Sequence, residues 1–152
     1  MKKNEGRQTV ATNKDARFRY FIEETMEAGI ALHGTEVKSL RTGKVQIADA
    51  YVYFRNGEAL LANMHIPEYT HGNRENHLPL RERKLLLQRK QIDRWAAAVN
   101  KEGRTVVPLE VYFSKGRAKV EIGLAKGKKI HDKRATLKEK EAKREMDRAR
   151  KS

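Results

Sequence analysis

The sequence contains no cysteine and no long hydrophobic run. Without cysteine there can be no disulfide framework, no thiolate nucleophile and no cysteine-ligated zinc. No apolar stretch approaches the roughly 20 residues that cross a bilayer, and the N-terminal residues lead into no hydrophobic signal segment. We therefore expect a soluble cytoplasmic protein that does not enter a membrane.

Recognisable catalytic patterns are also missing. The sequence has no phosphate-cradling glycine loop, no nucleophile elbow and no pair of histidines at the spacing of a metal-binding helix. Glu23 and Glu24 are adjacent, so in a strand their side chains point apart and make a poor acid and base couple. His71 and His77, with Glu75 between them, could at most bind a metal weakly. We expect no enzyme activity, no cofactor and no metal.

Positive charge is what the sequence has in excess. Lys and Arg number 34 against 20 Asp and Glu, so the formal net charge is +14 over 152 residues. A compact chain with such a surplus repels itself unless a polyanion neutralises it, which favours nucleic acid as the partner. A merely solvated basic surface is the alternative; a membrane face is disfavoured because no basic amphipathic stretch is present. The length allows one hydrophobic core with appendages.

Short strands with tight turns dominate residues 15–124. Asn56-Gly57 and Lys115-Gly116 each separate two apolar runs, which predicts hairpins over 50–64 and 105–124. Pro108 puts its strand at an edge or a bulge. The other expected elements are strands at 18–22 and 29–32, helices at 34–43 and 91–102, and a long loop at 67–83.

These elements predict a mainly β fold. Many short strands with one or two packed helices indicate a small antiparallel barrel of the oligonucleotide-binding (OB-like) type, which removes exposed sheet edges by closing on itself. We expect three segments: a flexible N-terminal arm (1–14), the barrel (15–124) and a basic C-terminal tail (125–152). We expect the protein to be a monomer.

The tail has its own composition. It carries 12 Lys and Arg against five Asp and Glu, half the net charge of the chain. Thr136-Leu137-Lys138-Glu139 matches a helix capping box. Large apolar side chains are almost absent, so the predicted state is disordered when free and helical when bound. His131, set among cations, could stack on an exposed base, although a solvated histidine fits the spacing as well.

Taken together, these residues resemble the SsrA-binding protein (small protein B, SmpB) family from about Asn13 to the end. The stretches that carry the resemblance are Asn13-Lys14 with Ala16-Arg17, Tyr20-Phe21-Ile22-Glu23-Glu24, Glu27-Ala28-Gly29, Gly34-Thr35-Glu36-Val37-Lys38-Ser39-Leu40-Arg41, Asn63-Met64-His65-Ile66, Arg83-Lys84-Leu85-Leu86-Leu87, and Gly123 through Arg134. Relatives usually carry a His and an acid before Tyr20, where this chain has Phe18-Arg19, so no contact is carried over to those two positions.

The resemblance implies an RNA-binding barrel. Such a protein binds the tRNA-like domain of transfer-messenger RNA and delivers it to stalled ribosomes in trans-translation, while its tail mimics codon-anticodon contacts near the small-subunit rRNA of the decoding centre. The implied barrel contacts are Asn13, Lys14, Arg17, Glu27, Leu86, Gln88 and Lys119. The implied decoding-centre contacts are Lys126, Gly127, Lys128, Lys129, His131, Asp132, Lys133 and Arg134.

Composition alone leaves another function open. A structural ribosomal protein, with its basic extension threaded through ribosomal RNA, has nearly the same charge pattern. A metal-dependent RNA hydrolase is a more distant alternative.

Overall fold

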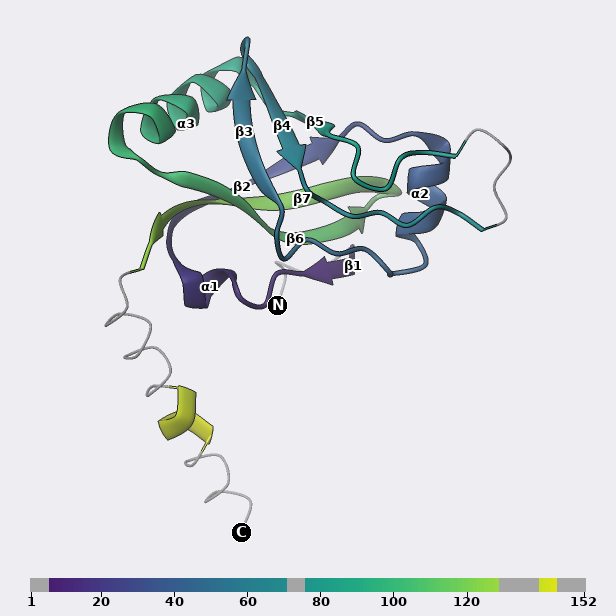
Figure 1. Ribbon diagram of the computed structural model, residues 1–152, viewed down its shortest axis with the longest axis horizontal. Helices are drawn as coiled ribbons and strands as arrows, with labels where there is room; N and C mark the ends of the chain where they lie inside the picture. The colour runs from purple at the N-terminus through teal and green to yellow at the C-terminus, as the bar shows by residue number, and fades with distance from the viewer. Residues whose placement is uncertain (1–5, 71–75, 129–139, 145–152) are drawn as a thin grey trace.

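The computed structural model describes residues 6–70, 76–128 and 140–144 (Figure 1). The described residues 6–70 and 76–128 form seven strands and three helices: β1 (Arg7–Thr12), α1 (Ala16–Arg19), β2 (Tyr20–Ile30), α2 (Gly34–Leu40), β3 (Tyr51–Arg55), β4 (Glu58–Ala62), β5 (Arg83–Leu86), α3 (Arg89–Glu102), β6 (Thr105–Ser114) and β7 (Arg117–Gly127). Within the described ranges, no helix has the length and apolar character that a membrane span requires.

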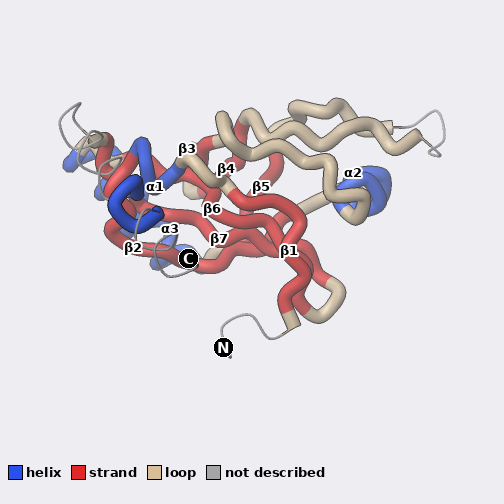
Figure 2. Tube along the Cα trace, turned by 90° about the horizontal axis from the view of Figure 1, so that it is seen from below, coloured by secondary structure: helices blue, strands red, loops and turns tan. Residues whose placement is uncertain are grey.

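The strands close into an antiparallel ring, which confirms the predicted barrel. Their order is β1-β6-β3-β4-β5-β2-β7, and β6 also pairs with β7, so six strands form the ring and β1 is added to β6. One edge of β6 serves two partners: Val106 pairs with β3, and residues 110–114 pair with β1. Figure 2 shows β1 beside β6 and β7.

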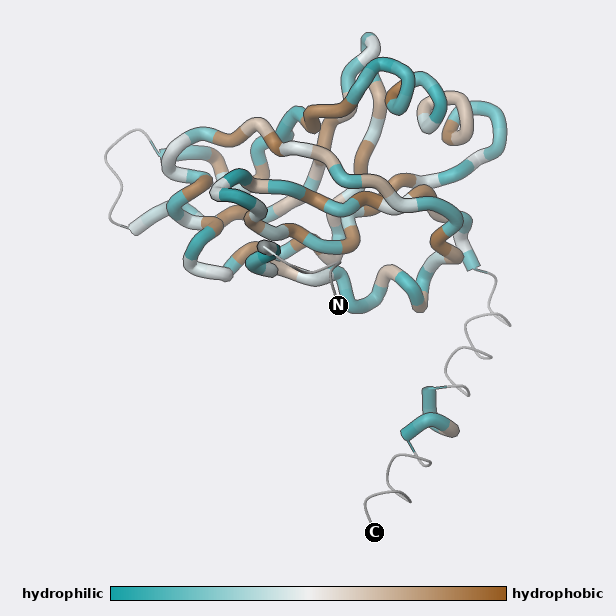
Figure 3. Tube along the Cα trace, turned by 180° about the vertical axis from the view of Figure 1, so that it is seen from behind, coloured by the Kyte–Doolittle hydropathy of each residue, from teal (hydrophilic) through white to brown (hydrophobic). Residues whose placement is uncertain are grey.

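Alternation along the strands separates core from surface. Val111 and Phe113 of β6 and Val120 and Ile122 of β7 belong to the buried core, whereas the residues between them face outward. Figure 3 shows the same alternation of hydrophobic and hydrophilic positions along the chain. In these stretches the period of two gives the strand one apolar face for the barrel interior, whereas Val107 and Leu109 of β6 are buried in a second, smaller cluster with Ala16 and Ala125.

Both predicted hairpins are confirmed. Asn56 and Gly57 have φ values of 52° and 74°, and Lys115 and Gly116 have 52° and 76°, the positive angles that a two-residue turn of this kind requires. Pro108 lies at a register shift between β6 and β7, as expected for a residue without an amide hydrogen.

The two longer helices cover opposite ends of the barrel (Figure 1). Helix α2 buries Leu40, and helix α3 buries Ile92 and Trp95 against the same core. Helix α3 ends at Gly103, which has a left-handed φ of 66°. The predicted helices at 34–43 and 91–102 are therefore confirmed, with small shifts at their ends.

The prediction of a flexible arm over residues 1–14 is wrong for residues 7–12, which form β1. Val10 and Ala11 pack against the core, and β1 pairs with β6 along its length. The sequence of these six residues has no strand pattern of its own. They form a strand because one edge of β6 is free to pair with them. Residues 1–5 lie outside the described part.

The strands expected at 18–22 and 29–32 form one long strand instead. Phe18 belongs to the short helix α1, and β2 runs without interruption from Tyr20 to Ile30. Nine residue pairs with β7 hold its polar middle in place. Long-range pairing therefore overrides the weak local pattern.

The barrel extends beyond residue 124, so the predicted boundary of the tail is also wrong. Ala125 is fully buried, and residues 125–127 pair with Ile22, Phe21 and Tyr20 of β2. Residues 140–144 are helical and exposed. The Lys140 amine lies 5.9 Å from the centre of the Phe18 ring, a contact worth about 0.5–1 kcal/mol at an exposed site. The capping box at 136–139 lies outside the described residues.

Candidate nucleic-acid interface

A polar cluster lies on the outer face of the barrel, across β2, β7, β6 and β1. It consists of Arg7, Glu27, Glu110, Tyr112, Lys119 and Glu121, which we call the sheet-face cluster. Cross-strand register brings them together, because Glu27 pairs with Glu121 and Lys119 with Tyr112. The cluster has two cations and three carboxylates, a net charge of −1 on a chain of charge +14.

Three donor groups from neighbouring side chains surround the carboxylate of Glu27. The Tyr112 hydroxyl donates a hydrogen bond to Oε2 of Glu27. The Lys119 amine lies 3.9 Å from Oε1, and a guanidinium nitrogen of Arg7 lies 3.9 Å from Oε2. The carboxylate is nevertheless about half exposed, so it can still accept a hydrogen bond from a ligand.

Tyr112 acts as a fixed donor inside this cluster. Its side chain is buried beneath Arg7, whose guanidinium carbon lies 4.0 Å from the ring centre. Burial, together with the hydrogen bond to Glu27, raises the pKa of the Tyr112 hydroxyl far above its usual value of 10.0. The hydroxyl therefore keeps its proton at physiological pH and holds one orientation of Glu27.

Leu86 extends the outer face toward β5. It pairs with Gly29 of β2, which in turn pairs with Lys119 of β7. The Leu86 side chain is 56% exposed and lies over Gly29, where an added Cβ would approach it to 3.3 Å. Glu27, Leu86 and Lys119, distant in the sequence, thus meet on neighbouring strands.

Asn13, Lys14 and Arg17 lie at the other side of the cluster. They line a surface depression of about 390 Å³ together with Arg7, Glu110 and Glu121. Asn13 is anchored there, because its amide Nδ2 donates to the Pro108 carbonyl at 2.9 Å and its backbone N–H to the Leu109 carbonyl at 2.8 Å. Lys14 and Arg17 are exposed, which suits contact with phosphate.

Gln88 does not join this cluster. It is the N-cap of α3, where the Gln91 side chain accepts from the Gln88 amide at 2.9 Å and the Gln91 amide donates to the Gln88 backbone carbonyl at 3.0 Å. Its described contacts are those of a helix cap. The sequence carried no warning of this, since Gln is not among the favoured capping residues.

Three of the eight expected decoding-centre residues are described. Lys126 and Gly127 form the end of β7, and the Lys128 amide donates to the Arg19 carbonyl at 3.0 Å. The Lys128 amine lies 4.8 Å from the centre of the exposed Phe21 ring. Lys129, His131, Asp132, Lys133 and Arg134 lie outside the described residues.

Arg7, Glu110, Tyr112 and Glu121 were missed by sequence reasoning. The alternation of β6 and β7 could have placed Glu110, Tyr112 and Glu121 on the same outer face as Lys119. For Arg7 there was no signal, because the strand that carries it was not predicted.

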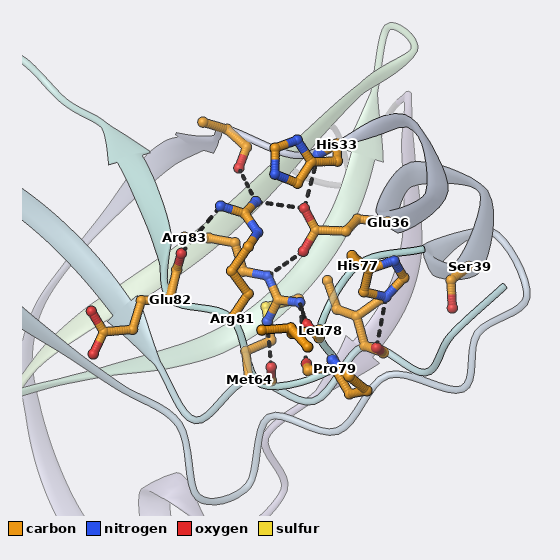
Figure 4. Close-up of polar contacts among 12 residues, drawn as sticks. His33, Glu36, Ser39, Met64, His77, Leu78, Pro79, Arg81, Glu82 and Arg83 are labelled. Atoms are coloured by element: carbon orange, nitrogen blue, oxygen red, sulfur yellow. Dashed lines mark hydrogen bonds and ion pairs between the residues drawn. The ribbon is translucent and has the colours of Figure 1, made fainter. Parts of the chain in front are cut away.

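A buried ion pair joins helix α2 to strand β5 (Figure 4). Glu36 of α2 and Arg83 of β5 have no exposed side-chain surface, and Arg83 Nε donates to Glu36 Oε2 at 2.6 Å. Arg83 also donates to the carbonyls of Met64 at 2.5 Å and Pro79 at 3.1 Å, and Arg81 donates to Glu36 Oε1 at 2.5 Å. The long loop before β5 is thereby tied to α2.

Acid should weaken this network, because Glu36 must be ionised to accept so many donors. Burial pushes its pKa up, but hydrogen bonds from Arg81, the His33 amide and Arg83, with the charge of Arg83, hold the pKa below 4.5. The stabilisation is therefore present above about pH 4.5 and is lost as pH falls through the lower folded value. Urea unfolding at several pH values should show Glu36→Gln destabilised at pH 7 and nearer to the wild type at pH 3. Parallel pH profiles for the two proteins would contradict this prediction.

A metal site is not supported by the residues that the structure describes. No three His, Asp or Glu side chains among them are placed to hold an ion. Both ring nitrogens of His77 are already engaged, Nδ1 with the Thr35 hydroxyl at 3.0 Å and Nε2 with the Ile66 carbonyl at 2.8 Å. His71 and Glu75 lie outside the described part.

Comparison with known proteins gives one consistent family. A model of the family described as SmpB protein matches residues 10–152. An SsrA-binding protein from Novosphingobium aromaticivorans is 57% identical over 143 residues, which cover 93% of this chain and 89% of the relative. One from Shouchella clausii is 58% identical over 140 residues, covering 92% of this chain and 90% of the relative.

A solved structure gives the same answer for the fold. The structure described as "tmRNA-SmpB: a journey to the center of the bacterial ribosome" has a TM-score of 0.66 and 49% sequence identity. The match covers 79% of this chain and 85% of the other.

Proposed function

Because the chain belongs to the SmpB family of SsrA-binding proteins, we propose that it binds the tRNA-like domain of transfer-messenger RNA and delivers this RNA to stalled ribosomes in trans-translation. The protein is then an RNA-binding factor in ribosome rescue. The observation that carries the proposal within the structure is the gathering of Glu27, Leu86 and Lys119 on one outer face.

The chemistry of this face suits a folded RNA. Proteins recognise such RNA by phosphate and 2′-hydroxyl contacts and by unstacked bases. Lys119 supplies a cation, Glu27 accepts from base amino groups or hydroxyls, and exposed Leu86 offers an apolar surface to a base or sugar. Lys14 and Arg17 add two further cations beside the sheet-face cluster, in the depression that they share with Arg7.

The tail completes the proposed function at the ribosome. We assign decoding-centre contacts to residues from Lys126 to Arg134, with the rest of the tail following the vacant messenger path. The position of Gly127 supports this division, since β7 ends there and the chain leaves the barrel beside α1 (Figure 1). The tail is thus attached at a site distinct from Leu86 on β5.

Substitution of Glu27 or Lys119 should weaken RNA binding without unfolding the barrel. We expect Glu27→Gln and Lys119→Gln each to lower affinity for the tRNA-like domain about 10- to 150-fold, the range for loss of a charged hydrogen bond. Gel shifts at several salt concentrations measure both affinity and salt slope. If Lys119 neutralises a phosphate, its loss should make the slope shallower by about 0.7–0.9.

Two substitutions on α3 provide matched controls. Glu102→Gln and Lys101→Gln make the same changes at exposed positions near the end of that helix, and we expect affinities within about twofold of the wild type. Equal affinities for all four variants and the wild type would remove Glu27 and Lys119 from the interface.

A further inference from the structure

Arg7 occupies an unusual position for a residue so near the N-terminus. It precedes residue 10, where the match to the family model begins, yet β1 places it in the middle of the sheet-face cluster. Its side chain is only 15% exposed. It pairs with Ser114 in the β1–β6 register.

The distances show one guanidinium shared among three carboxylates. Its nitrogens lie 3.4 Å from Glu121, 3.8 Å from Glu110 and 3.9 Å from Glu27, while its central carbon lies 4.0 Å from the centre of the Tyr112 ring. The Thr9 hydroxyl, two residues along the same strand, donates to Glu110 at 2.9 Å. Glu27 and Glu110 each have a further hydrogen-bond donor, Tyr112 and Thr9 respectively, and Arg7 is the cation that lies near all three carboxylates.

Removal of Arg7 would change the cluster in two ways. Its net charge would fall from −1 to −2, and the carboxylates that now lie close together around one cation would move apart by mutual repulsion. The ring of Tyr112 would also lose its cover, and with it the constraint that aims its hydroxyl at Glu27. Both changes act on the proposed RNA contact without any contact between Arg7 and RNA.

We propose that Arg7 is a positioning residue for RNA binding: it holds Glu27 and Tyr112 in the orientation that the RNA meets. This inference rests on the proposed function. It assigns a binding role to the N-terminal strand, although Arg7 itself acts through Glu27.

A double-mutant cycle tests the proposal on the full-length chain with a transcript of the tRNA-like domain. Arg7→Gln should lower affinity roughly tenfold, the size expected for a lost charge-assisted interaction, and should leave the salt slope unchanged. In a Glu27→Gln background the same substitution should have less than about a twofold further effect, because its target is already gone. Tyr112→Phe, which removes only the hydroxyl, should couple to Glu27 in the same way.

Arg7→Lys keeps the positive charge at position 7 and serves as a control for a loss of affinity caused by unfolding of β1. It should bind with intermediate affinity, since a lysine can neutralise the carboxylates but cannot lie flat on the Tyr112 ring. Full additivity of Arg7→Gln and Glu27→Gln, with a salt slope shallower by about 0.7–0.9, would show a direct phosphate contact and overturn the proposal. So would wild-type affinity for Arg7→Gln. Failure of the wild type to bind this RNA would instead overturn the proposed function itself.

Discussion

Removal of residues 129–152 should leave RNA affinity nearly unchanged and abolish peptide tagging on stalled ribosomes. The barrel contacts proposed for transfer-messenger RNA all lie within residues 13–119. The truncated chain keeps β7 intact through Gly127, together with the Lys128 amide that donates to Arg19. We expect affinity for the tRNA-like domain within about threefold of the wild type, because the deleted cations contribute only non-specific attraction to this RNA.

The position of the cut decides whether this experiment can be interpreted. A cut after Leu124 would remove Ala125, which is fully buried, and three backbone pairs with β2. Such a chain should lose stability as well as its tail. Thermal unfolding of both truncations provides the control, with only the shorter chain destabilised. A large loss of RNA affinity in the chain that ends at Lys128 would contradict the separation between barrel and tail.

Arg83→Met should produce the largest loss of stability of any single substitution considered. Arg83 is fully buried and donates to Glu36 and to the carbonyls of Met64 and Pro79. Its removal leaves a buried carboxylate with fewer partners and takes the Arg83 donor from the Met64 carbonyl, while the Pro79 carbonyl keeps the Ile66 amide as a donor. Loss of one member of a buried ion pair costs about 3–5 kcal/mol. Domains of this size have about 5–15 kcal/mol of total stability. Urea unfolding should therefore show a greatly lowered midpoint.

The neighbouring residue offers a matched control. Lys84 follows Arg83 on β5, and its side chain is exposed. Its described ion pair is a 3.9 Å contact with Glu58. We expect Lys84→Met to change stability by less than about 1 kcal/mol. The double substitution Glu36→Gln with Arg83→Met should recover part of the loss, since no full charge then remains buried at position 36. Equal urea midpoints for Arg83→Met and Lys84→Met would show that the buried ion pair adds no more to the stability of the fold than an exposed lysine does, and would contradict this prediction.

Local signals predicted those parts of the fold that depend on a few neighbouring residues. Asn56-Gly57 and Lys115-Gly116 identified two hairpins because the turns need positive φ, and the helical pattern over 91–102 identified α3. The errors concern elements formed by distant partners. β1 exists because β6 has a free edge, and β2 is continuous because β7 pairs with its polar middle.

The interface could be predicted only in part, and for the same reason. Glu27, Leu86 and Lys119 came from the family resemblance, since no sequence spacing relates residues so far apart. The structure adds the register that places them on one face, and it adds Arg7 and Tyr112, which hold Glu27. Gln88 also came from the family resemblance, but its described contacts in this chain are those of a helix cap.

Sequencing of the RNA that copurifies with the protein tests the central claim most directly. The comparison is between the wild type and the Glu27→Gln/Lys119→Gln double variant, both purified at the same salt concentration. Binding through the outer face of the barrel predicts strong enrichment of transfer-messenger RNA with the wild type and its loss with the double variant. Recovery of ribosomal RNA alone, in equal amounts with both proteins, would contradict the account.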